Sequence, residues 1–280
     1  MKISNININK ISLKKAFMLL TATLFIIGGF FVATPHAFAA TVTTAGSGNW
    51  NSTTVNAPWP LGTVPVAGSD IIIANGNTVT VTANIANSPA TITINSGGQL
   101  TVGGFTLAVS GATTVSGTLA ITTGTGGTKT FTGNVTINSG GVWNETVAEA
   151  VTFGGNLQND GIFTASTGAH TFSGNGKTIG GTNAIAIPSL TITGTGASIV
   201  TNNGVLTVST TLAGADTLAN GSNATLNIGG TSSITTLTNA GTISRTGTGT
   251  TTTALANFTK ALLISVVLEQ SPASPTTLVV

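Results

Sequence analysis

Few residues of this chain could carry acid–base chemistry. Its 280 residues include six acidic residues, two histidines and no cysteine. Glu145 and Glu149 are the only acidic residues close together in sequence, and Asp160 follows 11 residues after Glu149. Paired carboxylates can act as general acid and base, and clustered ones can bind calcium. These three residues are therefore the weak candidates for an acidic or ligand site.

For each of these hypotheses of acid–base chemistry or metal binding, the sequence favours a simpler structural interpretation. Glu145 and Glu149 have no third acidic ligand nearby, so a solvated lateral loop is expected. His170 is the only histidine after residue 40 and has no base or metal partner in sequence, so we expect an exposed strand residue. The absence of cysteine excludes thiolate metal sites and disulfides. We predict no catalytic residue, no metal and no cofactor.

The three tryptophans are the remaining ligand candidates. Trp50 and Trp59 lie in a loop-rich segment near residues 46–70, and Trp143 lies among the repeats described next. Exposed tryptophans at these positions could stack on sugars. The alternative for Trp50 and Trp59 is a hydrophobic cap, because the terminal coil of a repeat protein needs atypical residues to cover its open edge. The cap is the favoured interpretation.

A short phrase recurs about every twenty residues. It consists of a small residue or Asn, then Gly, any residue and an apolar residue, at steps of 19, 24, 20, 43 and 37 for Gly98, Gly117, Gly141, Gly161, Gly204 and Gly241. A second phrase, Thr-Phe-x-Gly-Asn, begins at Thr130, Thr152 and Thr171. Such a period in short strands and turns is typical of a solenoid, and the two longest steps are interpreted as double coils.

The predicted fold is all-β, a single-stranded parallel β-helix with coils of about 20 residues. Apolar residues alternate with Thr, so the apolar positions should point inward. We expect one core containing Ile92, Ile94, Val135, Ile137, Leu190, Ile192, Leu226 and Ile228. An antiparallel β-sandwich is the competing architecture, but it gives no reason for one phrase to repeat at each coil.

The N-terminus predicts export. Residues 1–39 combine four lysines, an apolar run over residues 16–32 and the sequence Ala37-Phe38-Ala39, as in a signal peptide cleaved before Ala40. An uncleaved membrane anchor is the alternative. The remaining chain has four cations and six anions, so it should not bind nucleic acid through phosphates. Contact with a membrane is expected only during export.

The sequence divides into four segments. The signal peptide (1–39) precedes an N-terminal cap and loop (40–69), the repeats (70–253) and an atypical tail (254–280). The tail has an apolar-rich stretch over residues 254–268 and lacks the glycine pattern. A capping helix, a final strand and a truncated end all agree with this composition.

Several phrases resemble those of a known group. The opening resembles bacterial secreted β-strand-repeat proteins and the eight-glycine β-helical domain, through Gly48-Asn49-Trp50-Asn51, Val64–Ile73 and Gly76–Val81. The segments 159–164, 170–181 and 190–192 are similar to repeats of adhesin-like surface proteins. The resemblance covers most of residues 46–250. It implies a right-handed parallel β-helix on an extracellular protein, and it carries over no catalytic residue.

Three classes of function follow from these observations. The favoured one is a secreted or cell-surface structural or adhesive protein, whose partner would be a surface polysaccharide or another cell-surface protein. The second is a carbohydrate-binding module or a polysaccharide-acting enzyme. The third is ice binding, because pairs such as Thr91/Thr93 and Thr191/Thr193 would place threonines in rows. The unequal steps of 19, 24 and 20 argue against a constant register for those rows.

Overall fold

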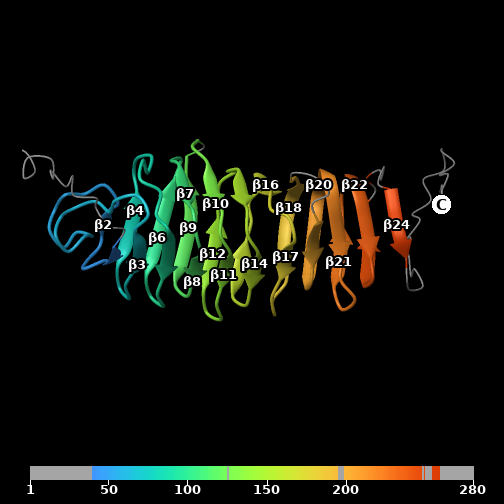
Figure 1. The fold of residues 1–280 in the computed structure, drawn as a ribbon, viewed down its shortest axis with the longest axis horizontal. Coiled ribbons are helices and arrows are strands. Elements are labelled where there is room, and N and C mark those ends of the chain that lie inside the picture. Colours follow the sequence, from blue (N-terminus) through green and yellow to red (C-terminus); the bar gives the residue numbers. More distant parts are fainter. Residues whose placement is uncertain (1–39, 125, 195–198, 248, 250–253, 259–280) are drawn as a thin grey trace, which may run out of the picture. The chain divides into compact units, whose positions relative to one another are not determined.

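The computed structural model describes residues 40–124, 126–194, 199–247, 249 and 254–258. The predicted signal peptide and residues 259–280 of the tail lie outside these ranges. The described chain is all-β, with parallel strands stacked as a solenoid of about 21 residues per turn. The coils follow one another in sequence order (Figure 1). The predicted solenoid is confirmed, and the antiparallel sandwich is wrong because all pairings between named strands are parallel.

Each regular coil contributes strands to three faces. Face 1 contains β7 (Leu107–Val109), β10 (Lys129–Phe131), β13 (Val151–Phe153) and β16 (Ala169–Phe172). Face 2 contains β1 (Thr41–Thr43), β3 (Asp70–Ile73), β5 (Thr91–Ile94), β8 (Thr113–Val115), β11 (Val135–Ile137), β14 (Leu157–Asn159), β17 (Lys177–Gly180), β19 (Ile199–Asn202) and β24 (Ala254–Phe258). Face 3 contains β2 (Gly48–Asn49), β4 (Thr78–Val81), β6 (Gln99–Gly103), β9 (Thr118–Thr123), β12 (Val142–Glu145), β15 (Ile162–Thr164), β21 (Thr225–Ile228) and β23 (Thr242–Arg245).

Three longer strands turn a corner and serve more than one face. They are β18 (Ile185–Ile192), β20 (Val205–Asn220) and β22 (Thr231–Asn239). Through their registers, β18 joins faces 3 and 1, β20 all three faces, and β22 faces 1 and 2.

The coils become shorter toward the C-terminal part. On face 2, Thr113 pairs with Val135 and Val135 with Leu157, steps of 22 residues. Later, residues 200, 218 and 237 pair in succession, at steps of 18 and 19. The strands remain in register because the turns absorb the difference in length.

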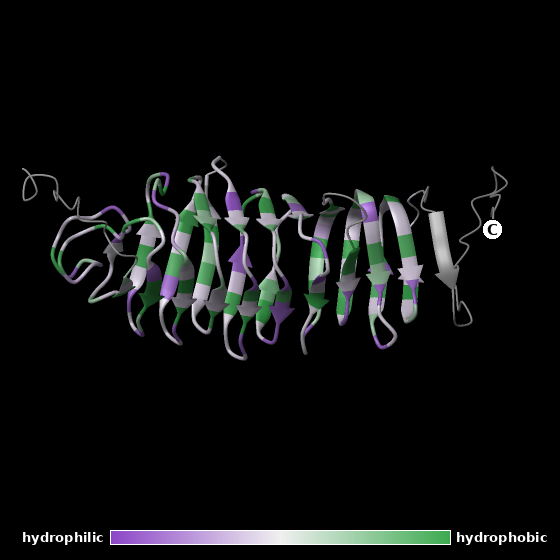
Figure 2. Cartoon of the chain, viewed as in Figure 1, coloured by the Kyte–Doolittle hydropathy of each residue, from purple (hydrophilic) through white to green (hydrophobic). Residues whose placement is uncertain are grey.

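The alternation predicted from sequence sets the core. Bands of apolar and polar residues alternate along the strands in Figure 2. In β5, for example, Ile92 and Ile94 are fully buried, whereas Thr91 and Thr93 are only partly buried. All eight predicted core residues are buried in one hydrophobic cluster. Because the side-chain period in a strand is two, a slip of one residue would expose this entire set.

The recurring glycines mark corners where successive coils approach closely. A Cβ built on Gly161 would lie 2.3 Å from the carbonyl oxygen of Gly141, and one on Gly141 would lie 2.1 Å from that of Val115. No side chain fits at such distances. The phrase found in the sequence is therefore a packing requirement at the corner between faces 2 and 3.

A row of buried asparagines runs along this corner in the later coils. Asn202 Nδ2 donates to Asn220 Oδ1, and Asn220 Nδ2 donates to Asn239 Oδ1, both at 2.8 Å. Asn202 and Asn239 also accept from the backbone N–H two residues onward, at Gly204 and Gly241. Each amide thus satisfies backbone groups at the turn and its neighbours in the stack.

The pairing extends beyond the predicted repeat segment at both ends. β1 pairs with β3 and β2 with β4, so residues from the predicted cap region continue the sheets. At the other end, β24 pairs with β22. Residues 254–258 of the tail form a strand, which was one of the three interpretations of this segment.

Candidate functional site: a buried acid–histidine corner

Three residues that the sequence analysis discussed separately meet in the turn from face 3 to face 1. Trp143 and Glu145 lie on β12, and His170 lies on β16, about one turn of the solenoid further along the chain. Trp143 Nε1 donates to Glu145 Oε1 at 2.7 Å, and His170 Nε2 lies 3.0 Å from Glu145 Oε2. Ser166 N donates to the same Oε2 at 3.0 Å. All three side chains are buried, and we call this group the acid–histidine corner.

The contacts of His170 determine where its protons lie. Nδ1 is 3.0 Å from the carbonyl oxygen of Gly168, which can only accept, so Nδ1 carries a proton. Nε2 faces the carboxyl oxygens of Glu145, so a second proton lies between the two side chains. Both ring nitrogens are therefore bonded to protein groups, and neither is free to accept a proton from a substrate.

An ion pair between Lys129 and Glu149 holds the corresponding turn one coil earlier. Lys129 Nζ lies 3.1 Å from Glu149 Oε2 and donates to the carbonyl oxygen of Gly126 at 2.9 Å. Gly126 N donates to Glu149 Oε1 at 3.0 Å. Lys129 and Glu149 are both almost completely buried. We call this group the lysine corner; its charges bond to each other and to the backbone of one turn.

The structure contradicts two of the favoured interpretations. Glu145 and Glu149 do not lie in a solvated loop, and His170 is not an exposed strand residue, because all three are buried. The physical reason is strand alternation: Lys129, Val151 and His170 pair in succession and all point inward. Each stands two positions before the phenylalanine of a Thr-Phe-x-Gly-Asn phrase. Aligning the three copies of the phrase would therefore have predicted that Lys129 and His170 point inward like Val151.

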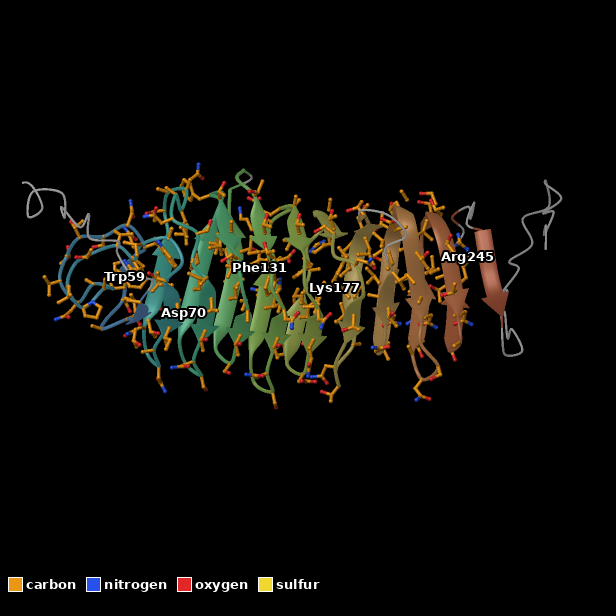
Figure 3. The ribbon with its side chains drawn as sticks, in the orientation of Figure 1. Trp59, Asp70, Phe131, Lys177 and Arg245 are labelled. Carbon is orange, nitrogen blue, oxygen red and sulfur yellow. The ribbon has the colours of Figure 1, made fainter. Side chains whose placement is uncertain are left out.

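The aromatic side chains beside these corners form one stack. Phe131, Phe153 and Phe172 follow each other with ring centroids 6.1 and 5.0 Å apart. Trp143 packs against Phe131 edge-on at 5.0 Å. Figure 3 labels Phe131 in these central coils. The charged groups are thus embedded in an apolar surrounding, which makes their pairing energetically necessary.

Asp160 does not join Glu145 and Glu149. It lies after β14 on the corner between faces 2 and 3, where its Oδ1 accepts from the Thr182 backbone N–H at 2.8 Å. Its Oδ2 accepts from Gln158 Nε2 at 2.6 Å. The Thr182 backbone bond, followed by the side-chain bonds from Gln158 and Thr182, lowers the pKa of Asp160 below its ordinary value. The three candidate carboxylates are therefore not brought together in one site.

The N-terminal tryptophans are packed inside the protein. Trp59 donates from Nε1 to the carbonyl oxygen of Trp50 at 2.6 Å, and their rings meet edge-on at 5.2 Å. Both are buried and belong to the core cluster. Trp59 is labelled among the N-terminal loops in Figure 3. With Trp143 also buried, none of the three tryptophans presents a face on which a sugar could stack.

Within the described ranges, no three His, Cys, Asp or Glu side chains converge as a metal site. In the same ranges no helix could span a membrane. No family model matches the chain, and comparison with curated proteins and with solved structures finds none similar to it. In both corners the titratable side chains bond to each other and to the backbone, so the two groups hold turns in place.

Proposed function

We propose that this chain is a secreted or cell-surface scaffold with a structural or adhesive role and no catalytic activity of its own. One observation carries the proposal. The side chains best suited to proton transfer, namely His170, Glu145 and Glu149, are buried and bonded to protein partners. A catalytic acid or base must reach the substrate, directly or through one water.

The surface composition supports recognition through shape and uncharged polar groups. Outward strand positions are mostly threonine, serine, asparagine and alanine, and the large apolar side chains exposed in the described ranges are aliphatic: Val55, Leu61, Ile162, Ile199 and Val205. The partner would be a neutral surface polysaccharide or another cell-surface protein. A polysaccharide-acting enzyme is the second candidate. The three tryptophans, which could have held a sugar substrate, are buried.

Export is part of the same proposal. The leader over residues 1–39 should be removed during secretion, giving a mature chain that begins at Ala40 or within two residues of it. N-terminal sequencing of protein recovered from the medium tests this. Secreted material beginning at Met1 would contradict it.

The absence of catalysis is tested with the secreted full chain on a panel of neutral and acidic polysaccharides. We expect retention of the chain on cells or on an immobilised polysaccharide, with no new reducing ends or unsaturated products. Glu145→Gln is the diagnostic variant, with Asp160→Asn as the control at a surface carboxylate. Turnover that is lost in Glu145→Gln while circular dichroism is unchanged would establish the enzyme instead.

A further inference from the structure

Face 1 carries an uninterrupted row of four threonines. Thr130 pairs with Thr152, Thr152 with Thr171, and Thr171 with Thr191, in consecutive coils. The sequence steps are 22, 19 and 20 residues, yet the four residues are in register. The expectation that unequal steps would prevent a regular row is therefore wrong, because the turns absorb the differences in coil length. The spacing along the row is that of neighbouring strands, about 4.8 Å.

The support beneath the row makes it regular. Phe131, Phe153 and Phe172 follow the first three threonines in sequence and point inward, and their ring planes differ by only 23° and 26°. Stacked rings of this kind require successive coils to superpose with little rotation. Threonine is β-branched and has few χ1 rotamers in a strand, so its methyl and hydroxyl groups are held in place.

The row offers unpaired hydroxyls on an uncharged surface. Within the described ranges, none of the four threonine hydroxyls bonds to another protein group. The outward residues around the row carry no charge: Thr128, Thr132, Ala150, Gly154, Ala169, Ser173, Ser189 and Thr193. The titratable side chains nearest in sequence, those of Lys129 and His170, are buried.

The other two faces lack a threonine row of this length. On face 2 the row Thr93, Thr114 and Thr136 ends at Ile72 on one side and Gln158 on the other. On face 3 the pair Thr80 and Thr101 is followed by Ala120 and Asn144. Face 1 therefore carries the longest threonine row.

We infer that the threonine row of face 1 binds the surface of ice, a ligand in addition to the polysaccharide or protein partner of the proposed adhesive scaffold. Water orders around methyl groups, and a hydroxyl beside each methyl can anchor that ordered layer by hydrogen bonds. A charged partner would be matched by charges, which this face lacks, and a sugar chain by exposed aromatic rings. Ice presents a neutral periodic array of donors and acceptors, so each threonine adds one weak contact to a rigid row.

The inference rests on the proposed scaffold function, and its test is independent of the polysaccharide assay. The secreted full chain is measured for thermal hysteresis and for incorporation into a growing ice hemisphere. We expect the wild type to show both, and Thr152→Lys combined with Thr171→Lys to lose most of both. Lysine is long and strongly hydrated, so it should hold ice away from the face.

Thr164→Lys is the matched control, because Thr164 lies on face 3 of the same coil as Thr152. It should retain the wild-type activity, with circular dichroism and melting temperature confirming the fold of every variant. A folded wild type without thermal hysteresis or ice incorporation would overturn the inference. Equal activity in the double lysine variant would do so too. Capture by a polysaccharide without ice incorporation would leave the scaffold proposal standing and remove ice as its ligand.

Discussion

The central coils, residues 129–172, and the later coils, residues 199–239, fill the same solenoid interior in different ways. The central coils bury a phenylalanine stack together with Lys129, Glu145, Glu149 and His170. The later coils bury aliphatic side chains and the neutral amides of the asparagine row. Burying a charge costs far more than burying an amide, so the central coils need closer matching of partners.

The length of the turns between faces 3 and 1 explains how the central coils meet this requirement. Their turns between faces 3 and 1 are long enough to supply backbone partners, such as Gly126 for Lys129 and Gly168 for His170. In the later coils the corresponding turn is as short as Gly229-Gly230, between β21 and β22. Short turns leave little backbone to surround a buried charge. In this solenoid, the buried Lys129, Glu149 and His170 lie beside the longer turns between faces 3 and 1.

The largest effect is expected from breaking the lysine corner. Lys129→Met should leave Glu149 buried without its cation and lower the free energy of unfolding by about 3–5 kcal/mol. Urea denaturation followed by circular dichroism measures this. The double variant Lys129→Met, Glu149→Leu removes both charges and should recover most of the loss. An unchanged midpoint for Lys129→Met would show that the pair does not support the central coils.

A smaller loss is expected from the asparagine row. Asn220→Leu removes the acceptor of Asn202 and the donor to Asn239, which should cost about 2–3 kcal/mol. The control is Asn223→Leu, because Asn223 is exposed in the turn before β21. If both variants lose the same stability by urea denaturation, the later coils do not depend on the row.

The corner glycines occur in both regions and should be sensitive to a single added methyl group. In Gly161→Ala the Cβ would lie 2.3 Å from the carbonyl oxygen of Gly141, so the coils must separate, at a cost of about 1–3 kcal/mol. Gly180→Ala is the control, since its Cβ would meet nothing closer than 3.4 Å. Thermal unfolding should rank Gly161→Ala below Gly180→Ala. The reverse order would contradict the close-approach explanation.

The smallest effect concerns Asp160, a surface carboxylate outside both buried networks. Its pKa is lowered in the folded chain, so its ionised form stabilises the fold above the ordinary pKa and this contribution is lost as pH falls through the lowered value. Asp160→Asn should therefore be slightly less stable than the wild type near neutral pH. The difference should vanish in acid. Urea midpoints measured across this pH range would contradict the assignment if the difference persisted at the lowest pH.

The fold could be predicted from the sequence because its pattern is local and is repeated in every coil. Alternation of apolar residues with threonine fixes which side of each strand faces inward, and glycine recurs wherever a coil corner permits no Cβ. The same reasoning predicted that Ile92, Ile137 and Ile228 share one core, and all three are buried. The long steps from Gly161 to Gly204 and from Gly204 to Gly241 also predicted two coils each.

The contacts at the corners were decided only by the tertiary structure. Glu145 and His170 are 25 residues apart and meet because two coils stack their turns at one edge, which no local pattern reports. The interpretation of Glu145 and Glu149 as solvated assumed that charges stay outside, but a partner from another coil offsets the cost of burying each carboxylate. The register of the threonine row likewise depended on turns absorbing unequal coil lengths. Strand period is a property of the chain, whereas pairing between coils is a property of how the chain stacks on itself.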